Sequence, residues 1–205
     1  MLDSPQHDFR TTALDPDLLS TPFGVQTSWH VITGAACCGK TTLIDLLADN
    51  GFLTVPETER QYLDIEMAKG RTIDEIFEDV TTEPGIYDMQ MRNEHGLRVT
   101  DVVFLDRALP DSLTFSRLAG LNPNEILAEC FHHRYASVFI LDRLPFQQNG
   151  ARIEDDAIAG LLDEWLARDY STLGYTVVRV PVLSIKDRLA FIFKTLSEQG
   201  LMYQL

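Results

Sequence analysis

Short apolar runs alternate along the chain with longer stretches in which apolar residues recur every third or fourth position. Such short runs are typical of buried strands, and the longer period is typical of amphipathic helices. The pattern predicts strands at 28–33, 52–56, 102–105, 136–141 and 175–180. It predicts helices at 40–49, 61–69, 72–80, 84–97, 111–118, 123–133, 154–171 and 184–198. This alternation predicts an α/β fold, a three-layer sandwich with a mostly parallel five-stranded sheet.

The first 27 residues follow neither period, apart from a short helical pattern at 16–19. They mix Asp, Pro, Ser and Thr with isolated apolar residues. We therefore expect residues 1–27 to be an N-terminal extension and residues 28–205 to form one domain.

A glycine-rich segment lies between the first predicted strand and the helix after it. It reads Gly-Ala-Ala-Cys-Cys-Gly-Lys-Thr and fits the pattern G-x-x-x-x-G-K-[ST] of the phosphate-binding loop, or P-loop. The glycines let the backbone curl until successive N–H groups face phosphate oxygens. The helix N-terminus adds a partial positive charge there. The motif predicts a P-loop NTPase fold, with a nucleotide bound by Gly34, Ala35, Ala36, Cys37, Cys38, Gly39, Lys40, Thr41 and Thr42.

The chemistry predicted for this loop needs a metal ion and a positively charged side chain. Lys40 supplies a point charge to the β- and γ-phosphates, and the Thr41 hydroxyl is placed to bind Mg²⁺. Asp106 ends a buried strand and is the second predicted Mg²⁺ ligand, directly or through water. Its neighbour is Arg107, whereas NTPases that hydrolyse ATP through an activated water commonly have Glu there. This difference favours a phosphotransferase, in which Arg107 contacts either the transferring phosphate or an acceptor-site carboxylate.

Glu57 lies at the end of the second predicted strand and is the predicted base that accepts a proton from an acceptor hydroxyl. Glu59 competes for this role, because alternation along a strand would point both side chains the same way. Asp111 either orients Arg107, binds the acceptor or caps a helix.

Arginines after the fourth predicted strand are expected to close over the phosphates. The segment 144–156 is polar and contains Arg152, our first choice for a lid arginine; Arg143 is the second. Tyr87, Gln90 and Arg92 could line an acceptor pocket, although packing explains such a helix face as well.

The formal net charge is −14, with 31 acidic against 17 basic residues. Nucleic acids and anionic membranes attract basic surfaces, so neither is expected as the main partner. Cys37, Cys38 and Cys130 are too few for a disulfide framework or a tetrahedral zinc site. No apolar run approaches the roughly 20 residues that span a bilayer, and no signal-peptide pattern begins the chain. We expect a cytoplasmic protein; the sequence leaves open whether it forms a homodimer.

Several segments together resemble the small P-loop proteins labelled AAA and regarded as ATPases or kinases, a group that includes the ribosylnicotinamide kinase portion of the NAD-biosynthesis regulator. These segments are residues 34–41, 55–60, 104–107 with Asp111, 138–141 and 175–181 before Arg188. The resemblance implies a kinase-like fold, binding of ATP or GTP with Mg²⁺, and a Glu57/Arg60 pair and Asp106–Arg107 facing the nucleotide. Glu59 departs from the small residue expected between Thr58 and Arg60.

Two functions fit these observations. The first is a small-molecule kinase that uses Mg·ATP and a nucleoside-like phosphate acceptor. In it Glu57 activates the acceptor hydroxyl, and Lys40, Arg107 and Arg152 stabilise the transferring group. The alternative is a nucleotide-dependent regulatory ATPase or GTPase, or a binding protein, without a small-molecule acceptor.

Overall fold

A parallel five-stranded sheet forms the centre of the computed structural model, which describes residues 9–143, 156–201 and 203. Its strands are β2 (Trp29–Thr33), β3 (Leu53–Val55), β4 (Val103–Asp106), β6 (Ser137–Leu141) and β7 (Val177–Val180). They lie in the order β3-β4-β2-β6-β7, and every neighbouring pair is parallel. The predicted α/β fold class and the five strands are confirmed, with end shifts of one or two residues.

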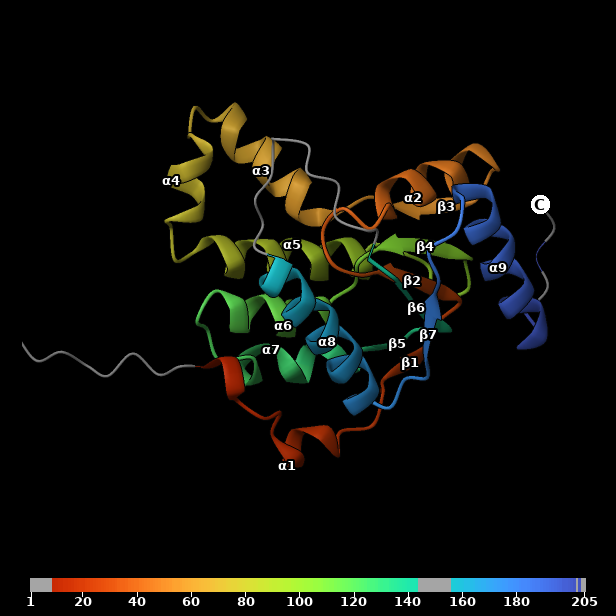
Figure 1. Ribbon diagram of the computed structural model, residues 1–205. Coiled ribbons are helices and arrows are strands. Elements are labelled where there is room, and N and C mark those ends of the chain that lie inside the picture. The colour runs from red at the N-terminus through yellow and green to blue at the C-terminus, as the bar shows by residue number, and fades with distance from the viewer. Residues whose placement is uncertain (1–8, 144–155, 202, 204–205) are drawn as a thin grey trace, which may run out of the picture.

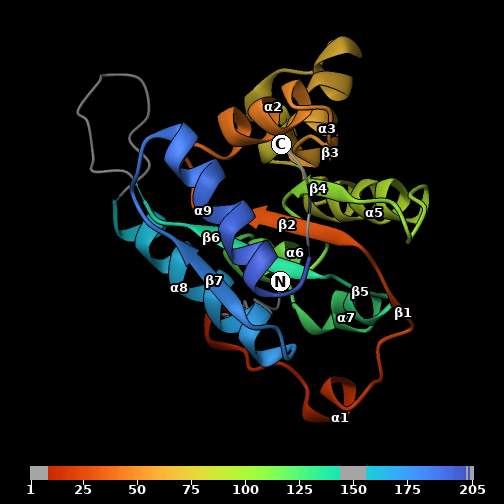
Figure 2. The ribbon, with the colours of Figure 1, turned by 90° about the vertical axis from the view of Figure 1, so that its right-hand side faces the viewer.

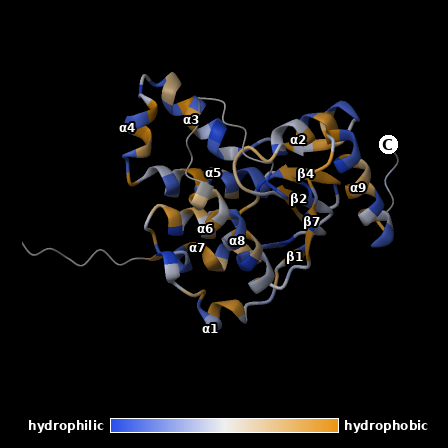
Figure 3. Ribbon diagram, in the orientation of Figure 1, coloured by the Kyte–Doolittle hydropathy of each residue, from blue (hydrophilic) through white to orange (hydrophobic). Residues whose placement is uncertain are grey.

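Helices cover both faces of this sheet, as Figures 1 and 2 show. On one face lie α2 (Lys40–Asp49) and α9 (Ile185–Glu198); on the other lie α5 (Thr82–His95), α6 (Asp111–Leu118) and α8 (Asp156–Thr172). Side chains alternate along each strand. Val31 and Leu105 therefore lie in the core beneath α6, on the face that α5, α6 and α8 cover. Ile32 and Phe104 lie in the core beneath α2 and α9. Helix α9 shows this two-sided character in Figure 3, where hydrophobic and hydrophilic segments alternate along its ribbon.

Three helices connect β3 to β4 and extend beyond the sheet in Figure 1: α3 (Thr58–Ala68), α4 (Ile73–Phe77) and α5. Helix α3 begins three residues earlier than predicted, directly after Glu57. Helix α4 begins with a capping box, in which the Thr72 hydroxyl and the Glu75 carboxylate bind each other's backbone N–H. The early start of α3 changes the geometry expected for Glu57 and Glu59, as described below.

The prediction of one helix over residues 123–133 is wrong in its second half. Helix α7 (Asn124–Leu127) runs into the 3-10 helix η2 (Ala128–Phe131), and the chain then forms strand β5 (His133–Arg134). Strand β5 pairs in parallel with β1 (Val25–Gln26). This pairing joins segments far apart in the sequence, so local periodicity could not indicate it.

The segment before β2 packs against the rest of the molecule. It contains the 3-10 helix η1 (Phe9–Thr11), the short helix α1 (Pro16–Leu19) and β1. Leu14 is buried in the core beneath α6, and the Phe23 ring lies 5.1 Å from that of Phe131. Arg117 Nε donates a hydrogen bond to the Thr12 carbonyl at 3.2 Å. Residues 9–27 therefore contribute to the core, and the domain boundary at residue 28 stays a prediction.

None of the described helices combines the length and apolar composition that crossing a bilayer requires.

Candidate functional site

The phosphate-binding loop connects β2 to α2 at the carboxyl edge of the sheet. Gly34 and Gly39 adopt φ angles of 141° and 92°, and Cys37 adopts 60°. A Cβ at Gly34 would lie 2.9 Å from the Leu141 carbonyl oxygen. Glycine is thus required at position 34 by both its backbone angle and its close approach to β6.

Lys40 begins α2 and folds back over the loop. Its Nζ donates hydrogen bonds to the carbonyl oxygens of Gly34 and Ala35, both at 3.0 Å, and the residue is 6% exposed. Since Nζ lies within the curl of the loop, its charge is available to an anion bound there.

Arg188 braces the loop from behind, a role that sequence reasoning missed. This α9 residue is 2% exposed, and its guanidinium donates to the carbonyl oxygens of Cys38 and Asp142. One signal was present in the sequence: Arg188 stands four and eight residues before Ile192 and Leu196, on the buried side of an amphipathic helix. A charged residue on such a face needs partners, and here they are loop carbonyls.

The two predicted Mg²⁺ ligands lie side by side. The Thr41 hydroxyl is 3.4 Å from Asp106 Oδ2, and Asp106 Oδ1 is buried without a hydrogen bond from the described residues. Burial raises the pKa of Asp106 to about 6, although the positive charge of Lys40 opposes this. A hydroxyl and an orphaned carboxylate oxygen are donors that suit Mg²⁺. The described part of the chain holds no cluster of three or more His, Cys, Asp or Glu side chains suited to a metal.

Arg107 follows Asp106 in a left-handed backbone conformation, with φ of 69°. Its N–H donates to the Ile32 carbonyl at 3.0 Å, which fixes the turn against β2. The side chain turns toward α3, where Nε donates to Glu57 Oε1 at 2.7 Å, and its guanidinium lies 4.4 Å from the centre of the Phe115 ring. Arg107 thus forms an ion pair with Glu57, and the two contacts predicted for it in the reaction stay predictions.

Glu57 is the N-cap residue of α3, not the end of a strand. The expected alternation of Glu57 and Glu59 is therefore wrong, because Glu59 already lies in the first turn of the helix. Burial favours the neutral form of Glu57, but the charges of Arg107, Lys40 and Arg60 outweigh it and lower the pKa. Glu57 is thus ionised at neutral pH and pairs with Arg107.

Asp111 at the start of α6 holds the turn that carries Arg107. Its carboxylate accepts hydrogen bonds from the Ala108 N–H at 3.1 Å and from the hydroxyls of Thr33 and Tyr170, and lies 3.9 Å from Arg107 Nη1. It is 2% exposed. The three roles left open for Asp111 stay predictions.

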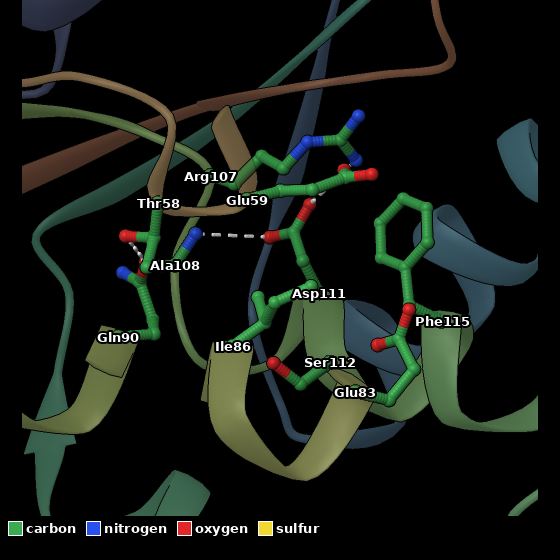
Figure 4. A pocket seen from close by; sticks show the side chains of 10 residues that line it. All are labelled: Thr58, Glu59, Glu83, Ile86, Gln90, Arg107, Ala108, Asp111, Ser112 and Phe115. Atoms are coloured by element: carbon green, nitrogen blue, oxygen red, sulfur yellow. Dashed lines mark hydrogen bonds and ion pairs between the residues drawn. The ribbon is translucent and has the colours of Figure 1, made fainter. Parts of the chain in front are cut away.

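A pocket opens between α3, α5 and α6, beside the Arg107 turn (Figure 4). Its lining residues are Thr58, Glu59, Glu83, Ile86, Gln90, Arg107, Ala108, Asp111, Ser112 and Phe115. One wall is rigid because Gln90 binds the Thr58 hydroxyl and the buried carboxylate of Glu94, which also accepts from the Leu109 N–H at 2.8 Å. Of the predicted pocket residues, Gln90 lines it, whereas Tyr87 packs against the core beneath α6 and Arg92 is exposed.

The predicted lid arginine Arg152 lies outside the described residues. Arg143 follows β6, and its guanidinium lies close to Gly160 of α8. The structure thus brings together Lys40, Thr41, Glu57, Asp106 and Arg107; their functional roles stay predictions.

The fold of this chain is similar to those of several solved structures. The NadR protein in complex with NR superposes with a TM-score of 0.65 at 18% identity, over 87% of this chain and 52% of that one. This chain therefore spans about half the length of NadR. Shikimate kinase from Aquifex aeolicus gives 0.52 at 15% identity, over 84% and 98% of the two chains. Deoxyadenosine kinase from M. mycoides gives 0.52 at 14%, over 83% and 99%.

These likenesses show a P-loop kinase-like fold. A search of curated proteins finds no match. A family model described as an AAA domain matches residues 29–188, which is most of the chain. The chain therefore belongs to this family of AAA-labelled P-loop proteins.

Proposed function

We propose that this protein is a small-molecule kinase that transfers the terminal phosphoryl group of Mg·ATP to a hydroxyl of a nucleoside-like acceptor. The observation that carries the proposal is the position of the pocket. Arg107 lines it and is joined to Glu57, and the charge of Lys40 in the phosphate-binding loop helps to lower the pKa of Glu57. An acceptor in the pocket would thus lie next to the phosphate end of a nucleotide in the loop.

Each residue has a defined task in this reaction. Lys40 and the loop N–H groups bind the β- and γ-phosphates, and Thr41 and Asp106 would hold Mg²⁺. When bound there, the metal would supply positive charge that offsets the negative charge of the phosphates. Arg107 Nη1 is buried without a hydrogen bond to the described residues, so it has a donor available for an oxygen of the acceptor or of the transferring group.

Glu57 accepts the acceptor's proton in this scheme. The O–P bond to the acceptor forms as the bond between the γ-phosphorus and the bridging oxygen of ADP breaks, and the hydroxyl proton passes to the carboxylate. The lowered pKa makes Glu57 a weak base, but it keeps the carboxylate ionised and able to orient the hydroxyl. In a loose phosphoryl-transfer transition state, orientation and charge neutralisation contribute most.

The kinase-like fold also supports a kinase function, since deoxyadenosine kinase and shikimate kinase share this architecture. The experiment below also compares ATP with GTP as the phosphate donor.

The test measures the release of ADP from ATP, or of GDP from GTP, by the purified protein with Mg²⁺. Release is measured without an acceptor and with each of a panel of nucleosides and vitamin precursors. We expect an acceptor to stimulate release, and Lys40→Ala to reduce it by about a hundredfold or more. The matched control is Lys194→Ala, because the Lys194 side chain is 76% exposed on α9. Slow, Lys40-dependent release that no acceptor stimulates would contradict the kinase and favour a nucleotide-dependent regulatory NTPase.

A further inference from the structure

Helix α4 exposes large apolar side chains at the outer end of the segment that connects β3 to β4. Ten such side chains are exposed in the described part of the chain, and five of them fall within residues 65–80. Phe77 of α4 is 56% exposed, and Val80 in the turn after it is 81% exposed. In Figure 1 this helix lies far from the sheet. Single exposed apolar residues are ordinary, whereas a concentration of them often marks an interaction surface.

The residues of α4 form rows of different character along the helix. At about 3.6 residues per turn, the order around the axis is Ile76, then Ile73 with Phe77, then Asp74 with Glu78. Ile76 is completely buried and attaches the helix to the protein, whereas the other four side chains are exposed. The row of Ile73 and Phe77 therefore adds apolar surface beyond what the packing of α4 uses, and an acidic row runs beside it.

The exposed acidic row carries charge that the protein does not match. Asp74 and Glu78 have no hydrogen bond or ion pair from their side chains to another described residue. The other two acids of this region are both used: Glu75 closes the capping box, and Asp79 pairs with Arg71 at 2.8 Å. A partner that brings both apolar side chains and positive charges would match the two rows together.

The exposed face is held in a fixed shape by contacts on the other side of α4. The Arg71 guanidinium donates to Glu66 at 3.1 Å and to Asp79 at 2.8 Å, which ties the end of α3 to the end of α4. The Thr82 hydroxyl donates to the Ile76 carbonyl and joins α4 to α5. Because the helix is already ordered, a partner would bind it with little loss of conformational entropy.

We propose that α4 docks a basic, amphipathic segment of another protein. Apolar side chains of that segment cover Ile73, Phe77 and Val80, and its lysines or arginines lie beside Asp74 and Glu78. A second copy of this chain fits the face poorly, because a symmetric contact would bring the same acidic rows together and each chain carries a net charge of −14. The docking is independent of the proposed kinase reaction, since no α4 residue lines the pocket between α3, α5 and α6.

Three synthetic peptides test the proposal. The basic probe is a helical peptide of leucine, lysine and alanine, with leucines at positions i, i+3, i+4 and i+7 and lysines beside them. The second peptide has glutamate in place of every lysine, and the third has the composition of the first in scrambled order. Binding of each labelled peptide to the full chain is measured by fluorescence anisotropy at low and at physiological salt concentration.

We expect the basic peptide to bind about tenfold more tightly than either of the others, and Phe77→Ser to weaken its binding about tenfold, because a central aromatic residue commonly dominates such an interface. Glu78→Gln should weaken it about threefold and reduce its salt dependence. Ile158→Ser and Glu164→Gln are the matched controls, because both side chains are exposed on α8. Urea denaturation should give the same unfolding midpoint for Phe77→Ser and Ile158→Ser as for the original protein.

Other outcomes would overturn the proposal. One is failure of the basic peptide to bind at millimolar concentration, and another is full affinity in Phe77→Ser. Equal binding of the basic and acidic peptides overturns the charge assigned to the partner. The oligomeric state of the full chain, measured by light scattering, tests the second copy: self-association that Phe77→Ser abolishes would assign the face to a homodimer instead.

Discussion

The phosphate-binding loop and the proposed acceptor pocket lie next to each other but are built in opposite ways. The loop is a continuous segment, and its shape comes from backbone angles at Gly34, Cys37 and Gly39. The pocket is assembled from side chains of α3, α5 and α6, which lie far apart in the sequence, from Thr58 to Phe115. A backbone-built site binds what all nucleoside triphosphates share, whereas a side-chain-built site can change its ligand by single substitutions.

The two regions meet at the pair of Arg107 and Glu57. Arg107 is attached through its backbone to β2, next to the loop, and its side chain faces the pocket. Substitutions on either side of this pair should therefore affect nucleotide and acceptor separately, and the following changes test that separation.

Asp106→Asn should have the largest effect, on the loop side. Replacing the carboxylate with an amide removes the negative charge that would hold Mg²⁺, and we expect turnover to fall by about a hundredfold or more. Turnover against Mg²⁺ concentration is the measurement. Asp101→Asn, which alters a partly exposed carboxylate paired with Arg98, is the control. An unchanged Mg²⁺ dependence would remove Asp106 from the metal site.

Asp111→Ala should be the largest change on the pocket side. It leaves the Ala108 N–H and the hydroxyls of Thr33 and Tyr170 without their acceptor in a buried place. We expect the free energy of unfolding to fall by about 3 kcal/mol, because removing one member of a buried polar network strands the others. Urea denaturation measures this.

Asp111→Asn keeps the size and one acceptor oxygen, so it should lose roughly half as much stability. Acceptor KM should rise in this variant while nucleotide affinity stays within about twofold of the original. Loss of nucleotide affinity equal to the loss of acceptor affinity would show that the two regions do not act separately.

Sequence patterns predicted the loop more completely than the pocket, and the reason is physical. The strands and loop depend on interactions between near neighbours in sequence, which leave a readable period or motif. Glu57 was misplaced because one helix start moved by three residues, which changes the direction of every side chain there. The left-handed conformation of Arg107 and the pairing of β1 with β5 depend on distant partners. Neither leaves a local signal.

Arg188→Lys should have a moderate effect on the loop side. Lysine keeps the charge but lacks the planar fork that reaches the carbonyls of Cys38 and Asp142 together. We expect nucleotide affinity to fall about tenfold, with acceptor KM little changed at saturating nucleotide. Arg98→Lys is the control, because that side chain is 81% exposed. Full nucleotide affinity in Arg188→Lys would mean that the brace adds nothing to the loop.

The smallest expected effect is a pH dependence of stability that belongs to Glu83. Its pKa is about 7 in the folded chain, beside Glu59 and Arg107, against 4.5 for the unperturbed group. Between these two pH values the folded chain holds a proton that the unfolded chain has released. The free energy of unfolding therefore falls as pH rises through this window, by an amount on the order of 1–2 kcal/mol for a half-buried group.

Glu83→Gln keeps this side chain neutral at every pH. The free energy of unfolding is measured by urea denaturation at a series of pH values in both proteins, and the difference between them isolates the contribution of Glu83. Asp106 and His30, whose pKa values are also shifted, contribute equally to both profiles. We expect the glutamine variant to become relatively more stable as pH rises from about 4.5 to about 7. Parallel profiles would show that Glu83 ionises normally.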